Sequence, residues 1–385
     1  MNKKNAIVLF ASLLLMVIFS SCLVTEDNVL SDPAKIERTS YDIDPSFDFQ
    51  GTIGLWKKFK KAAYTVTMDD GTYDQYSVAF PVMEELGIKG TYYLATNYID
   101  IGVWDDHGSI RKMMNWNQAA IIARAGHEIG SHSLNHYDMS KSDINTQKEL
   151  YDSREYIKSK IPGITVETFC WPHWRESPEA EELASKYYIS ARSGNGLLSH
   201  YLHRKGGIPS DSPDNMFEIN ALGFMNDQKK EDWQTVINEA YESQSWFVSS
   251  YHGVLENALT EDDSGWSPLT RDEFKETLLY PRDMGFWIDT FANVSKYIYE
   301  RDNATLHIKN KKKSIEIILD DKLDDQIYNQ TLSISFLKPE NWQSMEIQNI
   351  DTKNLAYSER DNKIFIDIFP DGNPIVIQPL LTGEE

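Results

Sequence analysis

The sequence predicts an α/β protein: a distorted, seven-stranded (β/α) barrel followed by a small all-β domain of the sandwich type. Between about residues 60 and 290, short β-prone runs alternate with amphipathic helical patterns, which is typical of a parallel sheet with helices outside. After about residue 300 the helical pattern stops and apolar and polar residues alternate. Hydrophobic residues make up 41% of the 385 residues, enough for a sizeable core.

The barrel elements follow from periodicity and from the residues that end each run. The first helix has apolar residues at helical spacing (Val78, Val82 and Leu86) and ends at Gly87. A later helix stops before Pro162. In chain order, strands are expected over 62–68, 90–95, 128–131, 166–171, 187–191, 246–251 and 286–290. Helices are expected over 76–86, 117–125, 144–160, 178–186, 231–243 and 272–284.

The C-terminal part reads as an antiparallel β domain over residues 301–385. Strands are expected over 304–308, 314–319, 331–336, 345–350 and 364–368. Turn-forming pairs such as Asp371-Gly372 separate them. This domain either packs on the barrel, which we favour, or binds carbohydrate. Trp342 is its one clear candidate for an aromatic platform that would contact a sugar.

The first residues predict a targeting segment. Lys3 and Lys4 precede an uncharged apolar run over 6–19 that is short for a membrane span. The following Phe19-Ser20-Ser21-Cys22 resembles the lipobox of bacterial lipoproteins. We therefore expect a signal peptide over 1–21, a lipid on Cys22, a tether and lead-in over 22–57, and a location in the cell envelope, periplasmic or surface-exposed. The alternative is an ordinary signal peptide with a chance cysteine.

The net charge limits the classes of binding partner, and the cysteine content limits the possible disulfides. The net charge of −21 argues against nucleic acid and against anionic membrane surfaces, so membrane contact is expected only through the lipid. The chain has two cysteines. With Cys22 lipidated, Cys170 is left without an intrachain partner, and we expect it to be a small buried residue rather than a nucleophile.

Residues suited to metal chemistry follow several of the expected strands. Asp69 and Asp70 end the first strand, and two adjacent carboxylates repel unless a cation neutralises them. His132 and His136 follow another strand at a four-residue interval, which on a helical turn places both imidazoles on one side. Because strand ends meet at one face of a barrel, these residues predict a divalent metal site of two histidines and a carboxylate.

Four motifs carry a family resemblance over roughly residues 58–295. They are Thr67-Met68-Asp69-Asp70-Gly71, His132-Ser133-Leu134-Asn135-His136, Phe169-Cys170-Trp171-Pro172-His173-Trp174 and Phe247-Val248-Ser249-Ser250-Tyr251-His252. Together they resemble the polysaccharide deacetylase family, also called carbohydrate esterase family 4 or the NodB-homology family. The deacetylase barrel is then expected over residues 58–300.

The resemblance implies a role for each motif residue. Asp70, His132 and His136 would hold a divalent metal, zinc first, with Co²⁺ or Ni²⁺ as alternatives. Asp69 would be the general base that takes a proton from water at the metal, and His252 the general acid. The backbone N–H of His173 would stabilise the oxyanion. The implied reaction is removal of an N- or O-linked acetyl group from a poly- or oligosaccharide.

The sequence departs from the family pattern at three points. The family's third-motif arginine has no counterpart within 169–174, and Arg175 or Arg192 could substitute. His173 replaces a tyrosine, and Gly253 stands where the family often has an aspartate. None of these departures removes a metal ligand, the base or the acid.

Aromatic residues and the remaining histidines leave other interpretations open. Four tryptophans could either line a sugar-binding groove or pack in the core: Trp104, Trp171, Trp174 and Trp266. Of these, Trp266 lies in a polar loop just beyond His252. His127 is expected to be structural. Two alternative functions remain, a metal-dependent amidohydrolase acting on a small non-sugar amide and a catalytically weak sugar-binding lipoprotein.

Overall fold

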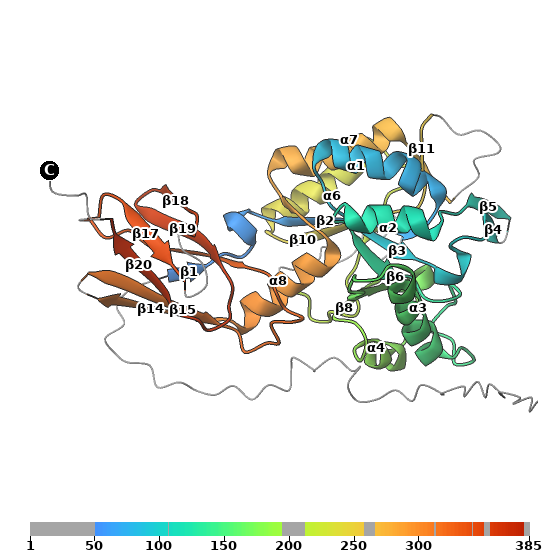
Figure 1. Ribbon diagram of the computed structural model, residues 1–385. Coiled ribbons are helices and arrows are strands. Elements are labelled where there is room, and N and C mark those ends of the chain that lie inside the picture. Colours follow the sequence, from blue (N-terminus) through green and yellow to red (C-terminus); the bar gives the residue numbers. More distant parts are fainter. Residues whose placement is uncertain are drawn as a thin grey trace, which may run out of the picture.

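The computed structural model describes residues 51–106, 108–194, 212–257, 266–311, 313–340, 342–349 and 355–380. An α/β region and an all-β region lie side by side (Figure 1). The expected signal peptide, the tether up to residue 50 and Cys22 lie outside the described residues. In the described ranges, we find no helix that is both long and apolar enough to cross a membrane.

A curled parallel sheet forms the centre of the α/β region. Its order is β8-β7-β6-β3-β2-β10-β9, and β13 also pairs with β2. The strands are β2 (Ala63–Asp70), β3 (Thr91–Leu94), β6 (Glu128–Ser131), β7 (Thr168–Cys170), β8 (Ser190–Arg192), β9 (Leu222–Gly223), β10 (Trp246–Tyr251) and β13 (Trp287–Ile288). A parallel bridge between Arg192 and Ile219 draws the two ends of the sheet together. The predicted distorted (β/α) barrel is therefore confirmed.

One strand of the described sheet, β9, was not predicted. It has only two residues, too few for any periodicity to appear in the sequence. Its pairing with Ser249 and Ser250 of β10 makes it part of the sheet. The described sheet thus has eight strands, one more than expected.

Helices cover the outside of the sheet (Figure 1). They are α1 (Phe80–Leu86), α2 (Trp116–Arg124), α3 (Thr146–Lys160), α4 (Pro178–Ala184), α6 (Lys230–Glu242), α7 (Arg271–Met284) and α8 (Phe291–Asn303). The first expected helix starts as a π-helical turn, η4 (Gln75–Ala79), that continues into α1. The sequence reading missed α8, although Phe291, Val294 and Ile298 are buried at helical spacing.

The all-β region consists of two four-stranded sheets, β1-β16-β19-β18 and β14-β15-β20-β17, paired antiparallel throughout. The strands are β1 (Gly51–Ile53), β14 (Thr305–Lys311), β15 (Ser314–Asp320), β16 (Leu332–Leu337), β17 (Met345–Gln348), β18 (Tyr357–Arg360), β19 (Lys363–Ile368) and β20 (Ile375–Pro379). The small all-β region is present as predicted. The sequence did not indicate that β1, from the N-terminal lead-in, pairs with β16.

The two regions share a buried apolar cluster. Trp246 and Trp287 of the barrel lie in the same cluster as Ile315 and Ile334 of the all-β region. Trp342, the aromatic candidate for a sugar platform, packs against this cluster and is half-buried. Burying this apolar surface stabilises both regions, so the all-β region packs on the barrel.

Candidate metal and catalytic site

A cavity of about 280 Å³ opens at the carboxyl ends of the barrel strands. It is lined by Asp69, Asp70, Arg111, His132, His136, Trp171, His173, Trp174, Arg175, His252 and Trp266. The residues predicted from the separate motifs therefore lie around one cavity. Strand ends of a parallel barrel meet at one face, which is the physical reason for this convergence.

The two aspartates reach the cavity through a change in backbone conformation. Side chains of a regular strand alternate between faces, so Asp69 and Asp70 would point in opposite directions. Asp70, however, has φ of 78° and Gly71 has φ of 86°. This left-handed backbone breaks the alternation, and both buried carboxylates line the cavity. A non-glycine residue at positive φ costs free energy, and such residues cluster at active sites and ligand-binding sites.

The two histidines do not lie on a helical turn, so that expectation was wrong. They follow β6 in a loop in which Ser133 has φ of 67° and His136 has φ of 56°. Their ring centroids are nevertheless 4.8 Å apart. The loop is held by Glu149 of α3, whose Oε2 accepts from the backbone N–H groups of Leu134 (3.0 Å) and Asn135 (2.7 Å). No local pattern pointed to Glu149, because its partners are loop amides distant in the chain.

Three side chains are arranged to hold a cation. Nε2 of His132 lies 3.6 Å from Oδ1 of Asp70, and Nε2 of His136 lies 3.4 Å from the same oxygen. Nδ1 of His132 donates to the carbonyl of Cys170 at 2.8 Å, which leaves the Nε2 lone pair for a metal. Within the described part of the chain, the buried Oδ1 of Asp70 has no hydrogen-bond partner. Two imidazole nitrogens and an unsatisfied carboxylate oxygen fit a divalent metal ion.

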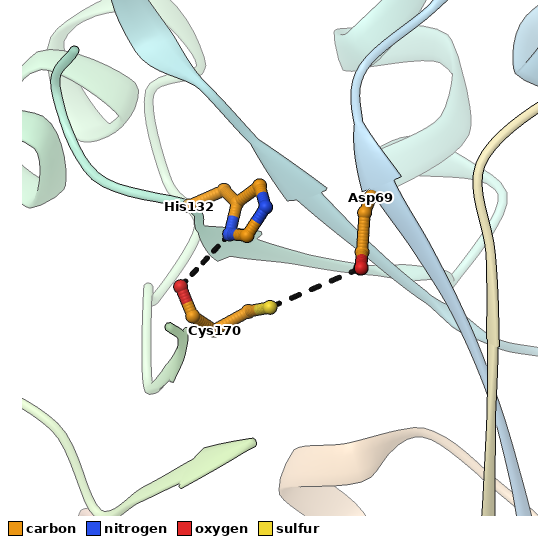
Figure 2. A group of neighbouring side chains, drawn as sticks. All are labelled: Asp69, His132 and Cys170. Atoms are coloured by element: carbon orange, nitrogen blue, oxygen red, sulfur yellow. Dashed lines mark hydrogen bonds between the residues drawn. The ribbon is translucent and has the colours of Figure 1, made fainter. Parts of the chain in front are cut away.

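A second group of possible ligands shares His132 with the first. Figure 2 shows Asp69, His132 and Cys170 converging from β2, the loop after β6 and β7. Sγ of Cys170 lies 3.9 Å from Oδ1 of Asp69, but it also lies 2.5 Å from Nη2 of Arg192. The guanidinium already supplies a positive charge here. Burial raises the pKa of the Cys170 thiol well above its ordinary value, so the thiolate that a metal requires is disfavoured.

His252, at the end of β10, faces Asp69 across the cavity. Its Nε2 lies 3.8 Å from Oδ2 of Asp69, and its ring centroid lies 4.2 Å from that of Trp266. Burial lowers the pKa of His252 to about 4, although Asp70 and Asp69 oppose this shift. An imidazole and a carboxylate at this separation are suited to moving protons at a group bound between them.

Residues 57–191 match the family model described as "Polysaccharide deacetylase". This chain contains a polysaccharide deacetylase domain. The match confirms the family that the sequence motifs led us to expect, and it includes the first three of the four motifs. The match covers the strand ends that carry the two aspartates and the two histidines.

Proteins similar to this chain include two curated relatives. A gellan lyase of a Bacillus species is 22% identical over 379 residues, which is 91% of this chain and 14% of that protein. The protein named "Putative polysaccharide deacetylase YxkH" of Bacillus subtilis (strain 168) is 26% identical over 156 residues, 38% of this chain and 52% of that protein. This chain therefore spans only 14% and 52% of the lengths of these relatives.

Among solved structures, the Streptococcus pyogenes deacetylase PplD in complex with acetate is 16% identical to this chain. The alignment covers 45% of this chain and 69% of that protein, with a TM-score of 0.37.

Of the two arginines considered for the missing third-motif arginine, Arg192 is the one that contacts the deacetylase-motif carboxylate. Its fully buried guanidinium donates to Oδ2 of Asp69, which also accepts from the hydroxyl of Ser250 at 3.1 Å. Arg175 is exposed, and its Nη1 lies 3.4 Å from Oδ2 of Asp138. In the deacetylase domain, Asp69 is therefore oriented from β8.

Arg111 was not anticipated. It lies on β5 (Ser109–Lys112), which pairs with β4 (Val103–Asp106), and its buried guanidinium donates to Oδ2 of Asp70. Burial alone would raise the pKa of Asp70, but Arg111 and the nearby histidines outweigh burial and hold this pKa well below its usual range. The arginine contacts the face of Trp104 at 4.9 Å, and Trp104 meets the ring of His136 edge-on at 5.2 Å. Nothing in the sequence of this hairpin identified the arginine.

The aromatic candidates divide into packing residues and residues at the cavity mouth. Trp171 is fully buried, and its Nε1 donates to the carbonyl of Phe217 at 2.8 Å, so it forms the wall. Trp174 is half-buried, and its ring centroid lies 6.4 Å from that of Trp266. Trp266 is 37% exposed. Trp174 and Trp266 both line the cavity and are the more exposed of these tryptophans.

Two further histidines were predicted, and only His173 lines the cavity. His173 is exposed and has φ of 58°; its Nε2 lies 3.2 Å from the carbonyl of His136. His127 is buried away from the cavity: its Nδ1 accepts from the N–H of Gly90 at 3.2 Å and its Nε2 lies 3.1 Å from Glu84. This placement agrees with the structural role expected for His127.

Proposed function

We propose that this protein is a metal-dependent hydrolase that removes N- or O-linked acetyl groups from a poly- or oligosaccharide. The observation that carries the proposal is the arrangement of two carboxylates with different partners. Asp70 faces two imidazole nitrogens, whereas the adjacent Asp69 is held by Arg192 and lies 3.8 Å from His252. One carboxylate is thus placed to bind a cation and the other to move protons.

Asp70, His132 and His136 are the residues that would hold the metal. Zinc suits this mixture of nitrogen and oxygen donors, and Co²⁺ or Ni²⁺ are the alternatives. When bound, a divalent ion supplies a Lewis acid that polarises an acetyl carbonyl and lowers the pKa of a water to about 7.

Asp69 is the proposed general base. Arg192 and Ser250 both donate to its Oδ2, which fixes the plane of the carboxylate at the cavity wall. A carboxylate oriented in this way accepts the proton of a water that attacks the acetyl carbon. The main-chain N–H of His173 is the proposed donor to the oxyanion that forms.

His252 is the proposed general acid. Burial lowers its pKa to about 4, so the role of acid requires neighbouring negative charge that keeps a proton on the ring for transfer to the leaving nitrogen or oxygen. Asp69 and Asp70 oppose the effect of burial and favour the protonated ring. Trp266, in contact with the imidazole, and Trp174 are proposed to stack on sugar rings at the cavity mouth.

Acetate release from chitin oligomers, peptidoglycan and acetylated xylan, with bound metal measured in parallel, tests this function. We expect release from at least one of these substrates, and we expect Asp69→Asn to abolish it while retaining the metal. Glycan binding without release by the wild-type protein would favour the sugar-binding alternative. Turnover of a small cyclic amide, but of no acetylated sugar, would favour the amidohydrolase alternative.

We also propose that the protein is anchored in the cell envelope through a lipid on Cys22. The support is the charged start, the apolar run and the lipobox-like Phe19-Ser20-Ser21-Cys22. Metabolic labelling with a fatty acid should mark the wild-type protein and not Cys22→Ser. Equal labelling of both would exclude this anchor.

A further inference from the structure

A buried side-chain amide joins the main chains of the residues proposed as base and acid. Nε2 of Gln75 donates to the carbonyl of Asp69 and, at 2.7 Å, to the carbonyl of His252. Gln75 is fully buried. A primary amide has two N–H groups, so this one nitrogen can satisfy both carbonyls at once.

The position of this bridge gives it a specific consequence. The parallel ladder between β2 and β10 ends at the pair Met68 and Tyr251. Asp69 and His252 are the next residues on each strand, where no ladder bond between these strands fixes their separation. Gln75 therefore continues the connection between the strands at the point where the two proposed proton-transfer groups begin.

Two neighbours of Gln75 hold the same segment of main chain. The hydroxyl of Thr72 approaches the carbonyl of His252 at 3.5 Å, and Oδ2 of Asp74 accepts from the N–H of Val254 at 2.5 Å. A Cβ on Gly253 would lie 2.8 Å from Cβ of Pro268, so the segment needs glycine to pass this close. The glycine that departs from the family pattern thus has a packing reason.

The local backbone directs Gln75 inward. Gln75 begins the π-helical turn η4, and such turns are rare and are frequently found at functional sites. The helix that follows, α1, lies on the outside of the barrel (Figure 1), while the buried amide of Gln75 lies at the carbonyls of Asp69 and His252.

The two proposed catalytic groups depend on this bridge to different extents. Asp69 is also fixed through its side chain by Arg192 and Ser250. For His252, no residue in the described ranges hydrogen-bonds the buried Nδ1, so the ring is placed mainly by its main chain and by Trp266. A change at Gln75 should therefore displace His252 more than Asp69.

We propose that Gln75, assisted by Asp74, is a positioning residue that sets the separation between the imidazole of His252 and the carboxylate of Asp69. The proposal rests on the proposed function of these two residues. It concerns the main chain and does not require Gln75 to touch substrate.

Leaving-group dependence tests the proposal. Gln75→Met removes both N–H donors and keeps the length of the side chain. Gln75→Glu keeps the shape of the side chain but places a carboxylate, which cannot donate, against the two carbonyl oxygens. With an acetylated amino sugar, whose leaving nitrogen needs a proton, we expect kcat to fall about 10- to 100-fold in both variants. With an aryl acetate, whose phenolate leaves without a proton, we expect a much smaller fall. Asp69→Asn should lose both activities.

The matched control is Gln378→Met, which removes a side-chain donor to Glu346 in the all-β region. We expect this control to change neither the ratio of the two activities nor the metal content. If Gln75→Met and Gln75→Glu fail to fold, Asp74→Ala provides the same comparison, because it releases the N–H of Val254. Equal losses on the two substrates, or no loss on either, would overturn the positioning role.

A crystal structure of Gln75→Met separates this inference from the proposed function. An increase in the distance between Nε2 of His252 and Oδ2 of Asp69, which is 3.8 Å in the native protein, would support the inference even if no acetylated sugar is hydrolysed. An unchanged distance would overturn it even if the wild-type protein is an active deacetylase.

Discussion

Arg192 at the end of β8 and Asp69 at the end of β2 form an ion pair in which both side chains are buried. The pair connects strands on different sides of the barrel, and the bridge between Arg192 and Ile219 lies at the same place. The arginine is thus part of the barrel closure as well as the partner of the proposed base.

Loss of the arginine should be costly for stability. We expect Arg192→Met to lower the free energy of unfolding by about 3 to 5 kcal/mol, because the carboxylate of Asp69 would remain buried without a counter-charge. Urea denaturation measures this change. Arg175→Met is the matched control, since that exposed side chain lies at a surface ion pair with Asp138; its effect should stay below about 1 kcal/mol. Similar effects of the two substitutions would contradict this account.

Arg111 should oppose metal binding while stabilising the metal-free protein. Its guanidinium pairs with Asp70, the carboxylate proposed to bind the cation. In Arg111→Met, Asp70 would lack that counter-charge, so we expect the protein in chelator to melt at a lower temperature. Added Zn²⁺ or Co²⁺ should then raise the melting temperature more than it does in the wild-type protein.

Lys112→Met is the control for the Arg111 comparison. Lys112 lies on the same hairpin, and its Nζ lies 4.0 Å above the ring of Tyr73. This variant should show the wild-type response to metal. A metal-induced shift that is the same in Arg111→Met and in the wild-type protein would mean that Arg111 does not oppose the cation.

The position of the motif residues at the ends of parallel strands explains which parts of the site could be predicted from the sequence. Asp69, Asp70, His132 and His136 occur in short motifs, and the ends of parallel strands must meet at one face. Their convergence therefore followed from local signals and a topological rule. Their catalytic roles stay predictions until activity is measured.

Residues that act through partners distant in the chain could not be predicted in the same way. Arg111 and Glu149 serve the site through Asp70 and through loop amides, and no local pattern distinguishes them from surface charges. The loop of His132 and His136 was read as helical because spacing alone does not reveal positive φ values. The pairing of β1 with the all-β region likewise depends on a partner almost three hundred residues away, since Ile53 pairs with Ile334.

The buried Glu300 should make stability depend on pH. Burial raises its pKa from 4.5 to about 9, so the native state keeps a proton that the unfolded state loses. Stability from this group is present below about pH 4.5 and is lost as the pH rises toward 9, at up to about 1.4 kcal/mol per pH unit. Glu300→Gln, neutral at every pH, should be as stable as wild type near pH 5 and more stable near pH 8.

Urea midpoints at the two pH values check the Glu300 prediction. Glu359→Gln is the control, because Glu359 is an exposed residue that pairs with Lys338. Its stability should follow the wild-type pH dependence. If Glu300→Gln differs from wild type by the same free energy of unfolding at pH 5 and at pH 8, Glu300 is ionised in the native state.

Two histidines of the described chain, one at the cavity and one away from it, allow a matched test of the metal site. His136 faces Asp70 at 3.4 Å, whereas His127 is enclosed between Gly90 and Glu84. We expect His136→Ala to weaken Co²⁺ binding by 100-fold or more, about 2.7 kcal/mol, because one of three protein ligands is lost. His127→Ala should keep wild-type affinity and lose stability, since the buried N–H of Gly90 loses its acceptor. The visible absorption of bound cobalt reports affinity and coordination together. A cobalt spectrum and affinity that survive in His136→Ala would place the cation elsewhere and remove the basis for assigning Asp69 as the free carboxylate.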